Sequence, residues 1–154
     1  MKQTHEPLTA AEIESGLSQA AELIQALQGA LEAEREALTQ ALPEPLELAT
    51  QAKRKVLDAL EPLVAFLVST ETKKSIARQP SPMAKKLDAR HSAVMAAAHN
   101  AKESNAVNGK ILARSQQSLL ELVQLMAGVT AGTTYSDRGQ VASAAGPSAT
   151  RAQA

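Results

Sequence analysis

The chain has 154 residues, of which 44% are hydrophobic and 1% aromatic, and its sixteen basic residues balance sixteen acidic ones. So few aromatic side chains are unusual for a globular core and favour helices packed through alanine and leucine. The balanced, mixed charge leaves no basic patch for nucleic acid, and the lack of cysteine excludes disulfides and thiolate metal sites.

A first helix is predicted over residues 9–42. Thr9 is followed three residues later by Glu12, which is the spacing of a capping box. Buried positions then recur in alternating steps of four and three, as in a heptad seam with one charged interruption at Glu34. The helix is expected to end at "LPEP", because each proline disfavours a helical residue before it. The predicted seam consists of Ile13, Leu17, Ala20, Ile24, Leu27, Leu31, Glu34 and Leu38.

A second helix is predicted over residues 45–70, with Pro45 in its first turn. Its apolar stripe is wider than a two-stranded seam, which indicates contact with two neighbours. Pro62 lies inside this helix, so we expect a kink or a break there. The polar segment "ETKKSIARQPSP" is typical of a connector, with Ser81 and Pro82 opening the next helix. The stripe consists of Val56, Leu57, Leu60, Leu63, Val64, Leu67 and Val68.

A third helix is predicted over residues 82–127, again with steps of four and three. The dipeptide Asn108–Gly109 is a turn signal, so a helix that ends at Asn108 is the alternative. The apolar repeat nevertheless keeps its phase across the dipeptide, which favours a continuous helix. Its seam consists of Leu87, His91, Val94, Ala98, Ala101, Asn105, Asn108, Leu112, Ser115, Leu119, Leu122 and Met126.

Together these elements predict an all-α fold, an elongated bundle of three long antiparallel helices with coiled-coil-like packing. The helical bundle spans residues 1–127, and residues 128–154 form a flexible tail rich in Gly, Ala and Ser that carries the single tyrosine, Tyr135. The longest apolar run, "PLVAFLV", is far shorter than the roughly 20 residues of a membrane span. We expect a cytoplasmic protein without membrane insertion.

No catalytic or cofactor-binding motif occurs, so we expect neither an enzyme nor a cofactor. His91 and His99 are eight residues apart and cannot share a metal ion on one helical face. We interpret them as structural or surface residues. Asn105 and Asn108 lie in the seam, where a buried amide selects register and partner orientation. The alternative is a seam that is exposed to solvent at this point.

Beyond Gly109 the third helix is apolar on more than one side. Ordinary packing against neighbouring helices is one explanation, and a surface that takes up a partner helix is the other. The main stripe consists of Leu112, Leu119, Leu122, Val123 and Met126, and Ile111, Leu120 and Leu125 lie off it.

The segment "NAVNGKILARSQQSLLELVQLM" followed by "TYSDRGQ" resembles the C-terminal signature of FlgN-type flagellar export chaperones. That family has Asn-Gly inside a long helix, then Leu and Gln positions, then a tyrosine and a glycine. One departure is Ser136, which follows the tyrosine where that signature has glycine. The matching positions here are Asn108, Gly109, Leu112, Gln116, Leu119, Tyr135 and Gly139.

The resemblance implies a chaperone that binds hook–filament junction proteins and prevents their premature assembly before type III flagellar secretion. The implied clients are the hook-associated proteins FlgK and FlgL, and components of the export apparatus are further candidate partners. The alternative is a structural coiled-coil or self-associating adaptor, a homo-oligomer without a client. The candidate client-binding residues are Asn108, Gly109, Ile111, Leu112, Gln116, Leu119, Leu120, Leu122, Val123, Met126, Tyr135 and Gly139.

Overall fold

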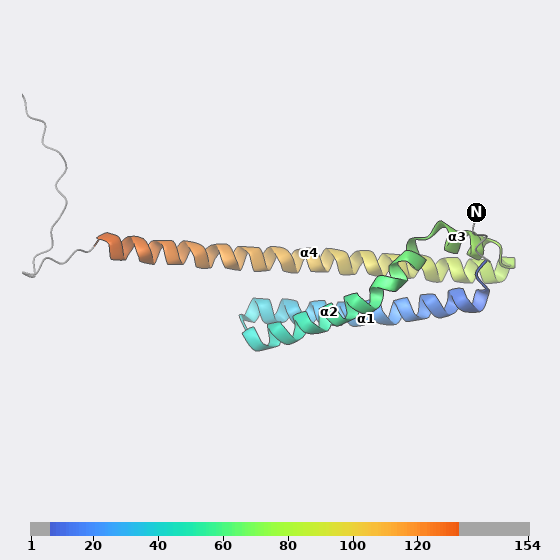
Figure 1. Cartoon of the computed structure of the whole chain (residues 1–154), viewed down its shortest axis with the longest axis horizontal. Helices are drawn as coiled ribbons and strands as arrows, with labels where there is room; N and C mark the ends of the chain where they lie inside the picture. Colours follow the sequence, from blue (N-terminus) through green and yellow to red (C-terminus); the bar gives the residue numbers. More distant parts are fainter. Residues whose placement is uncertain (1–6, 133–154) are drawn as a thin grey trace, which may run out of the picture. The chain divides into compact units, whose positions relative to one another are not determined.

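The computed structural model describes residues 7–132, and this part of the chain is all-α, with no strand (Figure 1). It contains four helices: α1 (Ala10–Gln40), α2 (Pro43–Val68), α3 (Thr70–Ala77) and α4 (Ser81–Gly132). The all-α prediction is confirmed, but the prediction of three helices is wrong because α3 separates α2 from α4.

The chain divides into two compact units, residues 1–113 and residues 114–154. The first unit contains α1, α2, α3 and the beginning of α4, and its core lies between these helices. The second unit contains the remainder of α4. The predicted tail falls mostly in residues 133–154, which lie outside the described residues.

Helix α1 begins as its sequence predicts. The Thr9 side chain accepts a hydrogen bond from the Glu12 amide, and the Glu12 side chain accepts one from the Thr9 amide, which completes the capping box. The predicted seam is buried from Ile13 to Glu34, and Leu38 is partly exposed. The apolar members of this seam form one side of the hydrophobic core.

The turn between α1 and α2 is tight. Ala41 adopts a left-handed conformation with φ of 54°, and the Leu42 amide donates to the Ala37 carbonyl at 2.9 Å. Helix α2 then begins at Pro43, earlier than predicted, because a proline without an amide hydrogen is tolerated in the first turn. Helix α2 also continues through Pro62, so of the predicted kink or break the break is wrong, and the kink stays a prediction.

The connector predicted after α2 is instead the short helix α3. The Ser69 side chain caps it by accepting from the Glu71 amide at 3.1 Å. Two of its polar residues are buried because their hydroxyls are paired: Thr72 donates to the Phe66 carbonyl at 2.8 Å, and Ser75 accepts from the Leu8 amide at 3.3 Å. The hydrophilic composition of this segment therefore did not predict a helix whose residues are buried against the rest of the first unit.

The long helices of the first unit alternate in direction. Arg90 contacts Glu14 and Ser18, and Asn108 contacts Leu31, so residue numbers rise together along α1 and α4 and these helices are parallel. Helix α2 runs antiparallel to both, as its direction in Figure 1 also shows. The predicted antiparallel order thus holds between α1 and α2 and between α2 and α4. Coiled-coil packing of these helices stays a prediction.

Helix α4 is continuous through Asn108 and Gly109, which confirms the prediction from the apolar repeat. It begins at Ser81, predicted as the cap, and extends to Gly132, beyond the predicted end at residue 127. Its seam is buried at Leu87, His91, Val94, Ala101 and Asn108, whereas Asn105 is exposed. The core of the first unit therefore extends along α4 to Asn108.

Two glycines in the interior of α1 allow a matched test of this packing. A Cβ atom at Gly29 would meet nothing within 4 Å, so Gly29→Ala should raise the free energy of unfolding by about 0.5–1 kcal/mol. A Cβ at Gly16 would lie 2.8 Å from the Phe66 ring. We expect Gly16→Ala not to raise the free energy of unfolding, because the Phe66 ring must shift to make room for the new methyl group. Urea unfolding of both variants measures the difference in stability between them. Equal stabilisation by both would contradict the observed Phe66 position.

Candidate functional site

A polar cluster joins α1, α2 and α4 at Asn108. The Asn108 side-chain nitrogen donates to the Leu31 carbonyl at 2.8 Å and to Glu34 Oε2 at 2.9 Å. Its side-chain oxygen accepts from Arg35 Nε at 3.1 Å. Asn108 is 2% exposed, so these hydrogen bonds satisfy an amide that would otherwise be costly to bury.

The second half of the cluster is a semi-buried ion pair. Lys53 Nζ donates to Glu34 Oε1, and it also donates to Asn105 Oδ1 at 3.2 Å. Thr50 lies 3.5 Å from the same carboxylate oxygen. Glu34 is buried, and its carboxylate is compensated by both charge and hydrogen bonds. Each of the two alternatives for the seam asparagines therefore applies to one residue. Asn108 is the buried amide, and Asn105 is exposed to solvent.

The Glu34 carboxyl has a lowered pKa. Burial raises the pKa of this group, but the hydrogen bonds from Lys53 and Asn108 and the nearby Lys53 charge together exceed that effect. The result is a pKa below the ordinary value of 4.5. The folded state therefore binds the Glu34 proton less tightly than the unfolded chain does.

This shift predicts an acid dependence of stability. The contribution of ionised Glu34 is fully present well above pH 4.5 and is lost as the pH falls through the unfolded and then the folded pKa. Glu34→Gln should be less stable than the parent at pH 7, and the gap should narrow towards pH 3. Urea midpoints across this range measure it. A gap that stays constant with pH would show that Glu34 ionisation does not stabilise the fold.

A cavity of about 360 Å³ opens beside this cluster. Leu38, Leu46 and Leu112 supply apolar walls, and Gly109 lies in its lining next to Asn108. A Cβ at Gly109 would meet nothing within 4 Å, so no neighbour in the described part of the chain requires a glycine there. The cavity thus combines apolar walls with the Glu34 and Lys53 pair at one end of the first unit.

The part of α4 in the second unit carries an exposed apolar face. The exposed fractions are 62% for Leu119, 51% for Leu122 and 57% for Val123. Helical spacing places these side chains on one side of α4, while Arg114 and Glu121 lie on the opposite side. An exposed apolar face of this kind is a candidate surface for binding another protein. We call it the α4 apolar face; it consists of Leu119, Leu122, Val123 and Met126.

A model of the FlgN protein family matches residues 1–143 of the chain. The chain belongs to the FlgN family. No curated protein and no solved structure matches it. The matched range includes α1, α2 and α3 as well as α4, so family membership does not depend on the C-terminal signature alone.

In this FlgN-family chain, the predicted site residues do not all lie together. Asn108 is buried in the polar cluster, and Gly109 and Leu112 line the cavity beside it. Ile111 is partly exposed and Gln116 is exposed. Tyr135 and Gly139 lie outside the described residues. Client binding by the whole set stays a prediction.

Neither Glu34 and Arg35 as partners of Asn108, nor Lys53 as the partner of Glu34, was apparent in the sequence. The available signal was one polar residue at a seam position in each of two helices, Glu34 in α1 and Asn108 in α4. Such residues pair when the helices are parallel and in register. The alignment of α1 with α4 was not predictable from the sequence, because it depends on how α3 brings the chain back beside α1.

Of the three histidines of the FlgN-family chain, His91 and His99 lie in the described part of the chain, one buried and one exposed, and His5 lies outside it. His91 is buried, and its Nε2 donates to the Leu67 carbonyl at 2.8 Å, so it joins α4 to the end of α2. His99 is exposed and lies 3.3 Å from Glu103. Within residues 7–132, no group of three or more potential ligands is arranged for a metal ion. No helix in this range is long and apolar enough to cross a membrane.

Proposed function

We propose that this chain is a cytoplasmic export chaperone that binds the hook-associated proteins FlgK and FlgL before their type III flagellar secretion. Membership of the FlgN family supports this role, and the α4 apolar face is the observation that carries it. The face takes up an apolar helix of the client, which keeps that helix from assembling early.

The exposure of the α4 apolar face favours binding of a client over packing of this face against other helices of the chain. Leu119, Leu122 and Val123 are each more than half exposed, so their apolar area is available to a partner. Burial of a leucine side chain contributes about 1.5–3 kcal/mol, and a few such contacts supply useful affinity. The charged residues Arg114 and Glu121 lie away from the face and stay solvated when it is covered.

Complex formation tests the proposal. Purified chain mixed with FlgK or FlgL at micromolar concentration should co-elute with each on size exclusion as a complex that is absent from either protein alone. Bovine serum albumin, mixed under the same conditions, is the negative control for nonspecific apolar binding. Absence of a complex with both hook-associated proteins would refute the assignment.

Self-association is the second candidate, because the same exposed face would equally serve a second copy. Sedimentation across a concentration range separates the two functions. A tight dimer that Leu119→Ser dissolves favours the self-associating adaptor, whereas a monomer that binds FlgK or FlgL favours the chaperone. Components of the export apparatus are further proposed partners of the loaded chaperone.

A further inference from the structure

An apolar groove of about 430 Å³ lies between α2 and α4, with α1 below it. Leu57, Leu60 and Val64 line it from α2, Ile24 and Leu27 form the floor from α1, and Ala98 lines it from α4. All of these residues belong to the first unit. The groove therefore differs from the α4 apolar face of the second unit.

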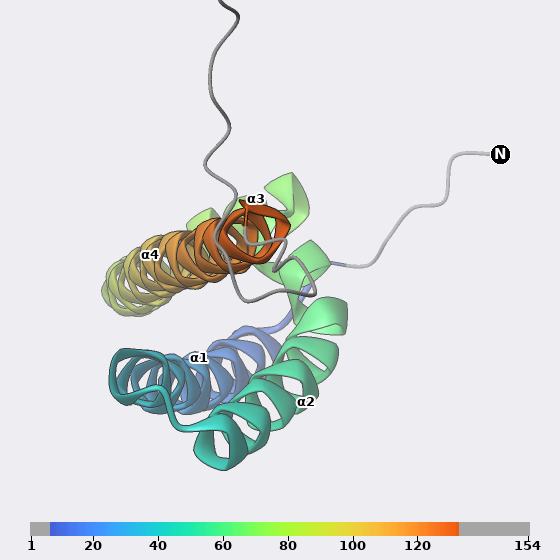
Figure 2. The same ribbon diagram turned by 90° about the vertical axis from the view of Figure 1, so that its left-hand side faces the viewer.

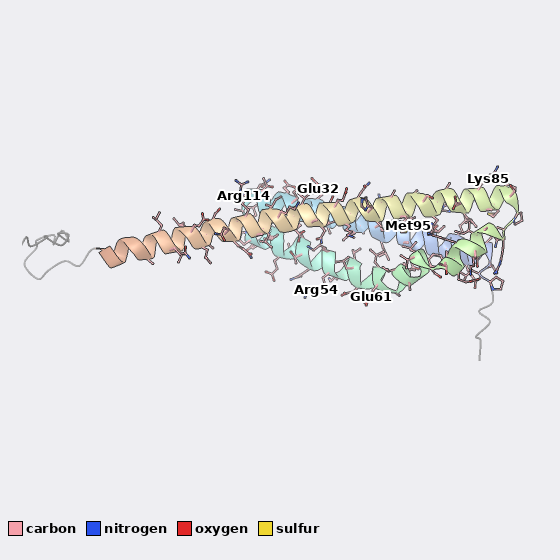
Figure 3. The ribbon with its side chains drawn as sticks, turned by 90° about the horizontal axis from the view of Figure 1, so that it is seen from above. Glu32, Arg54, Glu61, Lys85, Met95 and Arg114 are labelled. Atoms are coloured by element: carbon pink, nitrogen blue, oxygen red, sulfur yellow. The ribbon has the colours of Figure 1, made fainter. Side chains whose placement is uncertain are left out.

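In the view of Figure 3, helix α2 curves away from the line of α4 around Glu61, and two side-chain hydrogen bonds link α2 with α4. At one end the Leu67 carbonyl accepts from His91, and at the other the Asn105 side chain accepts from Lys53. His91 and Asn105 are about 20 Å apart along α4 at 1.5 Å per residue. Between them Ala98 contributes too small a side chain to fill the space. On α2 the lining extends from Leu57 to Leu67, about 15 Å or nearly three helical turns.

Helix α2 presents an unpartnered apolar stripe to this groove. Leu57 is 45% exposed and Val64 is 50% exposed, although Leu60 and Leu67 beside them are buried. The breadth of this stripe predicts two neighbours for α2. Figure 2, which looks along the helices, shows α2 beside α1 and α4 above α1. A helix in the groove would be the missing contact of the exposed stripe.

The charges that line the groove are acidic. Asp58 and Glu61 lie on its α2 wall, and neither makes a hydrogen bond or an ion pair in the described part of the chain. The cations close to these residues on the same helices are Arg54 and Lys55, one turn before Asp58, and Lys102, one turn after Ala98. All three are outside the lining. A partner that covers the groove must therefore supply positive charge towards α2, since unpaired carboxylates are costly to desolvate.

We propose that this groove binds an amphipathic helix of a partner protein, with a stripe of large aliphatic side chains and with lysine or arginine along the flank that faces α2. The aliphatic side chains enter the groove beside Ala98, and the basic flank pairs with Asp58 and Glu61. This is a helix-in-groove contact steered by complementary charge.

A second copy of this chain fits the groove less well. Its available apolar helix is the α4 apolar face, and the charged residues nearby, Arg114 and Glu121, lie on the other side of that helix. If the α4 apolar face of a second copy bound in the groove, the side chains placed over Asp58 and Glu61 would be uncharged. Charge complementarity therefore favours a basic partner helix.

The test uses the full chain and a designed helical peptide of about 16 residues, with leucines in one stripe and lysines along one flank. A matched peptide carries glutamates in place of the lysines. Fluorescence anisotropy at low salt should show at least tenfold tighter binding of the lysine peptide. Affinity should fall as salt is added, and Asp58→Asn with Glu61→Gln should flatten that salt dependence.

Two matched leucine substitutions locate the peptide. Ala98→Leu fills the groove and should weaken lysine-peptide binding at least tenfold without lowering the thermal midpoint of the chain. Ala96→Leu makes the same substitution at an exposed position of α4 outside the lining, and it should leave binding unchanged. Unaltered peptide affinity in Ala98→Leu overturns the proposal, as does failure of the lysine peptide to bind at millimolar concentration.

The experiment also separates this inference from the proposed function. Leu119→Ser lies on the α4 apolar face and should leave lysine-peptide binding intact; loss of binding in this variant would place the peptide on that face and overturn the inference. Ala98→Leu should keep binding to FlgK and FlgL. A concentration-dependent dimer that Ala98→Leu converts to monomer would identify a second copy as the occupant and would also overturn it.

Discussion

Leu119→Ser is expected to weaken binding of FlgK and FlgL by between tenfold and a hundredfold. Leu119 is 62% exposed in the free chain and lies on the α4 apolar face. Covering a leucine side chain contributes about 1.5–3 kcal/mol, and each 1.4 kcal/mol is tenfold in affinity. The same exposure means that the substitution removes little from the folded chain. Isothermal titration with each client measures the affinity, and urea unfolding checks that stability is unchanged.

Leu125→Ser is the matched control for this prediction. Leu125 is 66% exposed, and its position six residues later turns it about 120° from Leu119 around the helix. It should lose less than threefold in affinity. If Leu119→Ser and Leu125→Ser weakened client binding equally, binding would depend on the overall hydrophobicity of this part of α4 and not on one face of it. If neither did, the α4 apolar face would not be the client surface.

Much of the fold was predictable because its strongest signals are local. The Thr9 and Glu12 spacing predicted the start of α1, and the steps of four and three identified most of its buried residues, although they missed Ala30 and Ala37. The same repeat correctly favoured a continuous α4 over the turn signal of Asn108–Gly109, where a glycine in a helix costs only about 1 kcal/mol. Local spacing and apolar period therefore predict the long helices well.

Helix α3 was not predictable from the sequence because two of its buried residues are polar. Thr72 and Ser75 are polar in the sequence, yet both are buried because their hydroxyls bond to the chain at Phe66 and Leu8. These partners are set by tertiary packing, so hydropathy assigns such residues to the surface. One apolar residue, Ile76, is too weak a signal to reveal the inward face.

The candidate site was predictable in part. The surplus of leucine beyond Gly109 indicated exposed apolar surface, and the structure places Leu119 and Leu122 at the solvent. The partners of Asn108 were not predictable, since they depend on how α1 and α4 align side by side. The groove beside Ala98 was equally hidden, because it depends on how α2 and α4 lie between the two hydrogen bonds that link them.

Asn108→Ala is expected to lower the free energy of unfolding by about 2–3 kcal/mol. The substitution removes the donor to Glu34 and to the Leu31 carbonyl, and it removes the acceptor of Arg35. Glu34 would then keep Lys53 and Thr50 but would remain buried with fewer hydrogen bonds. Urea unfolding at pH 7 measures the loss.

Asn105→Ala is the control, because the same residue type lies three positions earlier on α4 at an exposed site. Its side chain accepts one hydrogen bond, from Lys53 at 3.2 Å, so the substitution should change stability by no more than about 0.5 kcal/mol. Similar losses at Asn105 and Asn108 would mean that the cluster is not buried as described. The expected contrast instead identifies Asn108 as the polar residue that holds α4 in register against α1, since its hydrogen bonds form in one alignment of the two helices.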